Sequence, residues 1–203
     1  MASNDLCPDP VVAPARRPAG EFTAVRAYLG DLRGRAVLDF GCAEPGVAAH
    51  AVASGAHYLG CAADDGSRAA ASDAGAGEIR VTDLDRWSGH DAGQFDVVVS
   101  SGALAYVRNL ARLLETWHHH VVPGGRLVFT VDHPVAIGGG RYFDEGVRQE
   151  YPRWAGRTAY HRTFESYVRE LRYCGFRLLE LTEGGTPETG APQWTAWRCV
   201  RTP

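Results

Sequence analysis

The sequence contains no lysine, and all 21 of its basic residues are arginine. A Schiff base or a general base supplied by lysine is therefore excluded. Cysteine is scarce, and its five residues form no C-x-x-C pair, which argues against a zinc site or a disulfide framework. The apolar runs are far shorter than the roughly 20 residues that span a bilayer, and no signal peptide is recognisable. We therefore expect a reduced, cytoplasmic protein without membrane contact.

The charge balance also lacks a strong bias. The formal net charge is −3, so no concentrated basic surface for nucleic acid is expected. A chain of 203 residues is long enough for one domain with a substantial core. The partner we expect is a small-molecule substrate, and the protein is expected to be a monomer or a homodimer.

Residues 1–20 are rich in proline and alanine and are expected to form a flexible N-terminal segment. Residues 21–203 are expected to form a single domain. Its first helix is predicted over residues 21–33, where apolar side chains recur at helical spacing, with Gly34 ending it.

From residue 36 onward the pattern alternates between strands and helices. Helices are predicted after the glycine-containing turn at 41–46, over 108–120 and over 164–174. Alternation of this kind predicts a doubly wound α/β domain of Rossmann-like type, with a mainly parallel seven-stranded sheet and helices on both faces. The last two strands, separated only by a loop, are expected to pair as an antiparallel hairpin at one edge. The predicted strands are 36–40, 57–62, 79–84, 95–100, 126–131, 176–182 and 194–201.

Four segments in this order carry a family resemblance: VLDFGCAEPG at 37–46, FDVVVSSGALAYV at 95–107, VVPGGRLVFTVDHP at 121–134 and YHRTF at 160–164. Together they resemble the class I S-adenosylmethionine (SAM)-dependent methyltransferases. The likeness is specifically to small bacterial enzymes with SSLALHYV, SVEHP and YHRT patterns. The resemblance covers residues 21–201 and implies SAM as cofactor and S-adenosylhomocysteine (SAH) as product.

The resemblance also implies where the cofactor binds. The glycine turn would meet the methionine and ribose parts of SAM, the end of the third strand would meet the adenine, and the end of the fourth strand would face the sulfonium. The residues assigned in this way are Asp39, Gly41, Cys42, Ala43 and Gly46 in the turn, Asp83 and Leu84 at the adenine, and Ser100 at the sulfonium.

Three departures from the family pattern affect this site. The second and third glycines of the turn are replaced by Ala43 and Pro45. In the family a carboxylate binds both ribose hydroxyls, and Ala62 occupies its position here. The loss of this carboxylate costs on the order of 1.5–3 kcal/mol, or about ten- to a hundredfold in affinity. Asp64 or the next residue is a candidate substitute. The family's usual histidine after the fourth strand is also missing, although Tyr106 remains as a catalytic candidate.

Two histidines are candidates for a general base. His133 follows the fifth strand at the carboxyl ends of the sheet, where open α/β sheets bind ligands. Its alternative role is a loop histidine hydrogen-bonded to backbone. His161 and Arg162 precede the last helix and could deprotonate and orient an anionic substrate. Alternatively both are solvated, or Arg162 pairs with Glu165.

Residues 135–163 are expected to form a substrate-side lid hinged at the glycines 138–140. The aromatic residues predicted to cover the substrate are Tyr142, Phe143, Trp154 and Tyr160. The run of histidines at 118–120 is not expected to bind metal, because adjacent helical residues point about 100° apart. No metal site is predicted.

The resemblance therefore predicts methyl transfer from SAM to a small-molecule acceptor, aromatic or of secondary metabolism. An alternative keeps the fold but has the altered pocket catalyse a non-methylating cyclisation, isomerisation or rearrangement. A third alternative is a non-catalytic binding module. The mass gain of one methyl group in a product separates the first from the other two.

Overall fold

The computed structural model describes residues 20–137, 141–148, 158–186, 188 and 190–203. The flexible N-terminal segment predicted over residues 1–20 lies outside this part of the chain except for its last residue. No helix within the described ranges is long and apolar enough to cross a membrane.

A seven-stranded sheet forms the centre of the domain, in the order β3-β2-β1-β4-β5-β9-β8. Strand β9 runs antiparallel to both of its neighbours, β5 and β8, and the other described pairings of this sheet are parallel. The predicted Rossmann-like α/β fold is confirmed. The strands are β1 (Ala36–Phe40), β2 (His57–Ala62), β3 (Glu78–Val81), β4 (Phe95–Ser101), β5 (Val121–Asp132), β8 (Phe176–Gly184) and β9 (Trp194–Arg201).

The C-terminal hairpin pairs β8 with β9 as expected, but β9 lies inside the sheet, between β5 and β8. The buried side chains of β9 on both faces, among them Ala196 and Trp197, require this central position. Strand β8 is the edge, and its pairing with β9 is interrupted by a bulge at Leu179.

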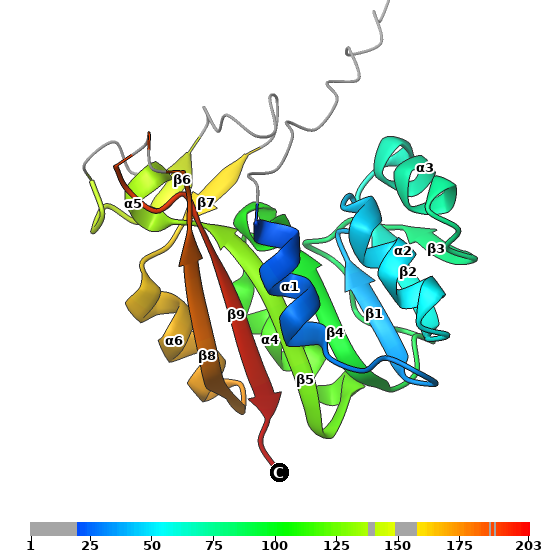
Figure 1. Cartoon of the computed structure of the whole chain (residues 1–203). Coiled ribbons are helices and arrows are strands. Elements are labelled where there is room, and N and C mark those ends of the chain that lie inside the picture. Colours follow the sequence, from blue (N-terminus) through cyan, green and yellow to red (C-terminus); the bar gives the residue numbers. More distant parts are fainter. Residues whose placement is uncertain (1–19, 138–140, 149–157, 187, 189) are drawn as a thin grey trace, which may run out of the picture.

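Helices cover both faces of the sheet (Figure 1). One face carries α1 (Glu21–Leu29) and α2 (Pro45–Ala53), and the other carries α4 (Leu110–His120) and α6 (Phe164–Tyr173). The core is divided accordingly. Valines of β1 and β4 pack with α1 and α2, while Trp117 of α4 and Tyr167 of α6 pack against the opposite side.

Several element boundaries differ from the sequence prediction. Helix α1 ends at Leu29, four residues before the predicted end, because Gly30 adopts a positive φ of 62°. Strand β3 ends at Val81, so that the predicted end of that strand, through residue 84, is a loop. Helix α3 (Asp65–Asp73) was not predicted in the Ala/Gly/Asp-rich stretch 62–77, where few apolar residues mark a buried face.

The region predicted as a lid contains three short elements: α5 (Pro134–Ile137), β6 (Gly146–Arg148) and β7 (Ala159–His161). Strands β6 and β7 pair antiparallel as a second small sheet. This sheet lies above the carboxyl edge of the main sheet, and β7 contacts the 3-10 helix η1 (Ala103–Tyr106) that follows β4 (Figure 1). We propose that residues 135–163 act as a substrate-side insert in a single domain over 21–203.

Asp96 ties the beginnings of β4 and β1 together. Its carboxylate accepts hydrogen bonds from the Ala36 amide (2.9 Å) and from the Arg35 guanidinium (2.8 Å). Burial raises the pKa of Asp96, but these hydrogen bonds and the arginine charge outweigh it and hold the pKa below its ordinary value of 3.8.

Replacing Asp96 by asparagine is expected to lower the free energy of unfolding by about 1 kcal/mol at neutral pH. The carboxylate stabilises the fold fully above its unfolded pKa of 3.8, and this contribution is lost as the pH falls through the lower folded value. Denaturant titrations of wild type and variant should therefore differ most at pH 7 and converge below pH 3.8. The exposed Asp73→Asn exchange serves as control, and a difference that persists at low pH would contradict this role.

Candidate functional site

The sheet order reverses between β1 and β4, and open α/β sheets bind ligands beyond the carboxyl ends of the strands at such a point. Gly41 begins the turn after β1 with a φ of 78°. A Cβ atom built on Gly41 would lie only 2.3 Å from the Cβ of Ala103 in η1. Glycine is therefore required here both by the backbone and by the close packing of the turn against η1.

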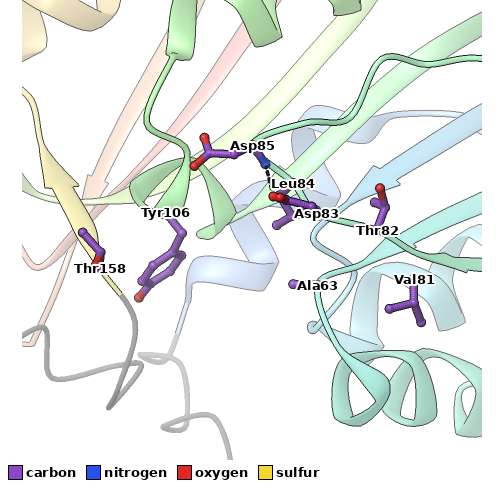
Figure 2. A pocket seen from close by; sticks show the side chains of 8 residues that line it. All are labelled: Ala63, Val81, Thr82, Asp83, Leu84, Asp85, Tyr106 and Thr158. Atoms are coloured by element: carbon purple, nitrogen blue, oxygen red, sulfur yellow. Dashed lines mark hydrogen bonds between the residues drawn. The ribbon is translucent and has the colours of Figure 1, made fainter.

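A cleft of about 560 Å³ opens beside this point (Figure 2). The loop after β3, the first residue after β2, the tyrosine of η1 and the residue before β7 all contribute to it. Its walls thus come from segments far apart in the sequence. The lining residues are Ala63, Val81, Thr82, Asp83, Leu84, Asp85, Tyr106 and Thr158.

Asp83 and Leu84, predicted to contact adenine, both line this cleft. Asp83 accepts a hydrogen bond from the Asp85 amide (3.0 Å) and forms an exposed ion pair with Arg86 (3.5 Å). Leu84 is 8% exposed and packs into the core below. A carboxylate at the rim and an apolar side chain at the base suit a flat aromatic base with an exocyclic amine.

The end of β2 offers no carboxylate to the cleft at the position of Ala62, whose methyl group is fully buried against α2 and α3. Asp64 caps α3, and its Oδ1 accepts the Ser67 amide at 2.7 Å. Asp65 is largely exposed and pairs with Arg68. One oxygen of Asp64 is thus committed to the helix, and Asp65 points into solvent.

The remaining turn residues have varied surroundings. Asp39 is 1% exposed, and its Oδ2 accepts a hydrogen bond from the Tyr58 hydroxyl (2.8 Å). Cys42 is buried. This burial, and to a smaller extent the negative charge of Asp39, raises the pKa of its thiol. Ala43 is half-buried. The ring of Phe22 from α1 lies 3.1 Å from a Cβ built on Gly46, so this glycine makes room for α1.

The end of β4 leads into η1, which contacts both the Gly41 turn and strand β7 of the small sheet. Ser100 is fully buried, and its Oγ has no hydrogen-bond partner in the described residues. Tyr106 is half-buried, and its side chain faces the cleft from η1 near Thr158 (Figure 2). Ser100 thus lies inside the sheet, whereas Tyr106 forms part of the cleft wall.

His133 uses both ring nitrogens within the protein. Its Nδ1 accepts a hydrogen bond from the Val135 amide (3.2 Å), so Nε2 carries the proton and donates a hydrogen bond to Glu183 (2.8 Å). The residue is 4% exposed, and its ring packs edge-on against Phe164. In this geometry His133 connects the end of β5 to β8, and no lone pair on its ring is available to a substrate.

His161 has a different arrangement. Its Nε2 lies 2.9 Å from the backbone carbonyl oxygen of Tyr142, which can only accept, so Nε2 carries the proton. The lone pair is therefore on Nδ1, which is buried without a hydrogen-bond partner among the described residues. The residue is only 2% exposed, on the strand that contacts η1.

Arg162 donates to three backbone carbonyls, those of Leu104 (3.2 Å), Arg108 (3.0 Å) and Val107. Its guanidinium also lies over the ring of Tyr160, 5.7 Å from the centroid. The alternative pairing with Glu165 is not the one adopted. Arg162 thus clamps β7 to the connection between η1 and α4.

The aromatic residues expected in the lid fall into three groups. The Tyr142 hydroxyl accepts the Phe164 amide (3.1 Å), and the Tyr160 hydroxyl accepts from Arg108 (3.2 Å). Phe143 stands 86% exposed and does not line the cleft. Trp154 lies outside the described residues.

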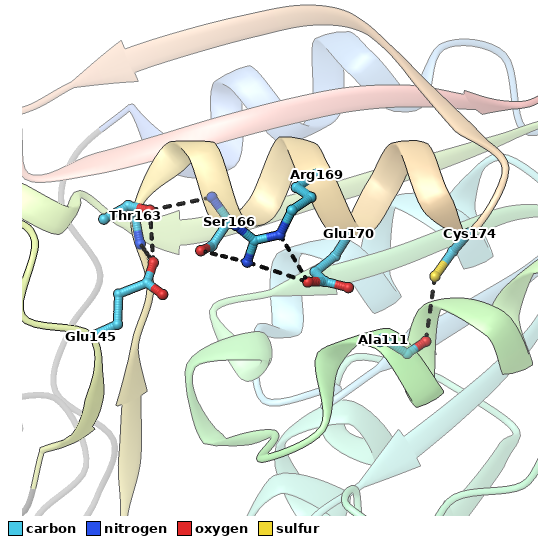
Figure 3. A network of polar contacts seen from close by, with 7 residues as sticks. All are labelled: Ala111, Glu145, Thr163, Ser166, Arg169, Glu170 and Cys174. Atoms are coloured by element: carbon cyan, nitrogen blue, oxygen red, sulfur yellow. Dashed lines mark hydrogen bonds and ion pairs between the residues drawn. The ribbon is translucent and has the colours of Figure 1, made fainter.

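Glu145 is a residue that the motifs did not single out. Its Oε1 accepts from both the amide (2.7 Å) and the hydroxyl (2.6 Å) of Thr163, the N-cap of α6 (Figure 3). Burial raises the pKa of Glu145, but hydrogen bonds from Ser166 and Thr163 outweigh it and lower the pKa. The small sheet is thereby fastened to α6. No local sequence signal marks this contact, because Glu145 and Thr163 are 18 residues apart in the sequence.

Within the described residues no cluster of three or more metal-ligating side chains exists. The consecutive histidines illustrate the geometry: His118 accepts from Arg201, His119 bonds to the Glu115 carbonyl and His120 bonds to the Gly93 carbonyl.

The comparisons with known proteins agree with this architecture. A family model described as a methyltransferase domain matches residues 15–181, most of the chain. The chain belongs to the methyltransferase-domain family. By family and fold it is an enzyme of the class I methyltransferase type.

Two solved structures illustrate the likeness. A SAM-dependent methyltransferase from Mesorhizobium loti is 28% identical with a TM-score of 0.78, over 89% of this chain and 97% of that one. A 1,6-didemethyltoxoflavin N1-methyltransferase from Burkholderia thailandensis, solved with its substrate and SAH, is 20% identical with a TM-score of 0.66, over 92% and 80%. The second likeness concerns the fold alone.

An uncharacterised protein of Haemophilus influenzae is 28% identical over 121 residues. That match covers 49% of this chain and 46% of the relative, so the chain spans about half the length of this curated relative.

The position of the cleft can be tested by filling it. Ala63 lines the cleft and is half-buried, so Ala63→Trp is expected to weaken SAH binding by about tenfold or more through steric exclusion. Isothermal titration calorimetry measures the effect. Ala69→Trp, on an exposed position of α3, is the matched control and should bind SAH like the wild type. Equal affinity of both variants would place the nucleoside elsewhere.

Proposed function

We propose that this enzyme transfers the methyl group of SAM to a small-molecule acceptor, aromatic in character, that enters beneath the segment 135–163. The observation that carries the proposal is the cleft at the β1/β4 switch point, with Asp83 and Leu84 on one wall and Tyr106 on the other. Relatives of the same fold act on small molecules, including 1,6-didemethyltoxoflavin and magnesium protoporphyrin IX.

The residues present fit the cofactor in most parts. Asp83 and Leu84 would hold the adenine. The turn from Gly41 to Ala43 would follow the ribose and methionine parts, and the buried Asp39 would face the positively charged part of SAM. Ala62 supplies no carboxylate for the ribose hydroxyls. In its place Asp64, half-buried at the start of α3, is the nearest carboxylate in the sequence.

SAM, when bound, supplies a methyl group on an electrophilic sulfonium. The protein must therefore align the acceptor and, for a weak nucleophile, remove its proton. We assign the proton transfer to His161. Its Nδ1 holds a lone pair in a buried setting, and its Nε2–H is fixed by the Tyr142 carbonyl. In this role Nδ1 of His161 would take the acceptor's proton.

Two of the other three catalytic candidates receive structural roles in this proposal. His133 holds β5 and β8 together through Glu183, and Arg162 fixes β7, and with it His161, against the η1–α4 connection. Tyr106 would contact the acceptor, because it lines the cleft from η1, the element that β7 contacts. Ser100, fully buried near the end of β4, would face the sulfonium end of SAM.

A second candidate function is a non-methylating rearrangement on the same fold. The observation that favours it is the buried alanine at position 62, with Asp64 bonded to its own helix, which weakens the ribose contact. Mass spectrometry of products formed with and without added SAM distinguishes the two. A product heavier by one methyl group supports transfer, whereas turnover by ligand-free enzyme without SAM supports rearrangement.

His161→Gln tests the proposed base. Glutamine keeps an N–H near the Tyr142 carbonyl but removes the Nδ1 lone pair. The rate constant of methylation is expected to fall by about 10²–10⁴-fold, while the affinity for SAH changes little. Single-turnover kinetics with an accepted substrate and calorimetry measure the two quantities.

The control is His133→Gln, which should lower the melting temperature through the lost Nδ1 acceptor for the Val135 amide and the lost ring contact with Phe164, with a much smaller effect on the rate per folded molecule. A large rate loss in the His133 variant, with normal rates in the His161 variant, would reverse the assignment.

A further inference from the structure

Asp39 is a carboxylate buried in the interior of the sheet. It is 1% exposed, opposite Gly60 of β2 and Val99 of β4. An ionised group in such surroundings is costly unless donors satisfy it. One donor lies on the neighbouring strand, where the hydroxyl of Tyr58 is 2.8 Å from Oδ2 of Asp39.

The contact spans two residues along the strand direction. Tyr58 pairs with Val37, and Asp39 pairs with Gly60, so the tyrosine reaches forward along β2 and passes over Gly60. A Cβ atom on Gly60 would lie 3.2 Å from the Tyr58 hydroxyl and 3.1 Å from the sulfur of Cys42. Glycine at position 60 therefore leaves the space through which the hydroxyl reaches the carboxylate.

The tyrosine also remains a donor over the whole accessible pH range. Burial, followed by the negative charge of Asp39, raises the pKa of the Tyr58 phenol far above its ordinary value. The hydroxyl of Tyr58 thus keeps its proton and donates a charge-assisted hydrogen bond to the carboxylate.

We propose that Tyr58 is a positioning residue for the cofactor, which acts by holding the carboxylate of Asp39 at the carboxyl end of β1. The inference rests on the proposed function, in which Asp39 faces the positively charged part of SAM. Asp39 directly precedes Phe40 and the Gly41 turn, so its orientation sets the charge presented there. Tyr58 would not touch the cofactor itself.

Tyr58→Phe removes only the hydroxyl. The dissociation constant for SAH is expected to rise by about tenfold, because the loss of a hydrogen bond to a charged group leaves the carboxylate less well held. Calorimetry separates this from misfolding, since misfolded protein lowers the number of binding sites and leaves the dissociation constant of the folded fraction unchanged.

The matched control is Tyr28→Phe. The Tyr28 hydroxyl also makes one side-chain hydrogen bond, to Thr182 at 2.6 Å, but it connects α1 to the edge strand β8. This variant should lose a similar amount of stability and retain wild-type affinity for SAH. If both variants bind SAH equally well, or both weaken it equally, Tyr58 has no special role.

A double-mutant cycle with Asp39→Asn tests whether Tyr58 acts through Asp39. In the background of the Asp39→Asn variant, the further Tyr58→Phe exchange should change the SAH affinity by less than about twofold. A full tenfold effect in both backgrounds would overturn the proposed route. If the Asp39→Asn variant binds too weakly to measure, the comparison of Tyr58→Phe with Tyr28→Phe decides the question.

The outcomes also separate this inference from the proposed function. A wild-type protein that fails to bind SAH would remove both. A wild-type protein that binds SAH, together with a Tyr58→Phe variant of equal affinity, would remove only the role of Tyr58.

Discussion

The contact between Gly41 and Ala103 is the constraint on which the site depends. It brings the turn after β1 against η1, the segment after β4, at the place where the sheet order reverses. Any side chain at position 41 would push these two segments apart and open the base of the cleft. The chemistry proposed above is thus built on a single backbone approach, to which the loop after β3 and the small β6–β7 sheet add walls.

Much of the fold could be predicted from the sequence, because its signals are local. The β-branched run at 95–100 and the glycine turn after residue 40 indicate buried parallel strands and their crossovers. Helix α3 escaped prediction because its alanine-rich sequence has few large apolar residues, and its stability comes from the Asp64 cap and packing on β2 and β3. The end of α1 was misplaced because two glycines were available and the first one ends the helix.

The candidate site was less predictable, since its geometry depends on contacts between distant segments. The sequence predicted Asp83 and Leu84 to contact adenine, and both residues line the same cleft. It did not distinguish His133 from His161 as the base, because their different hydrogen-bond partners appear only in the folded chain. Glu183 lies 50 residues from His133, and the Tyr142 carbonyl that fixes His161 belongs to a region without a strong pattern. Arginine at position 162 was likewise ambiguous until its three carbonyl acceptors were known.

The bulge at Leu179 has a consequence for how the protein meets copies of itself. Strand β8 presents the open edge of the main sheet, and two of its leucines are partly exposed. A long, regular edge of this kind invites pairing with the edge of another molecule. The extra residue breaks the hydrogen-bonding register, and the neighbouring charges of Arg177 and Glu180 discourage close approach. The edge is therefore protected against strand-to-strand aggregation.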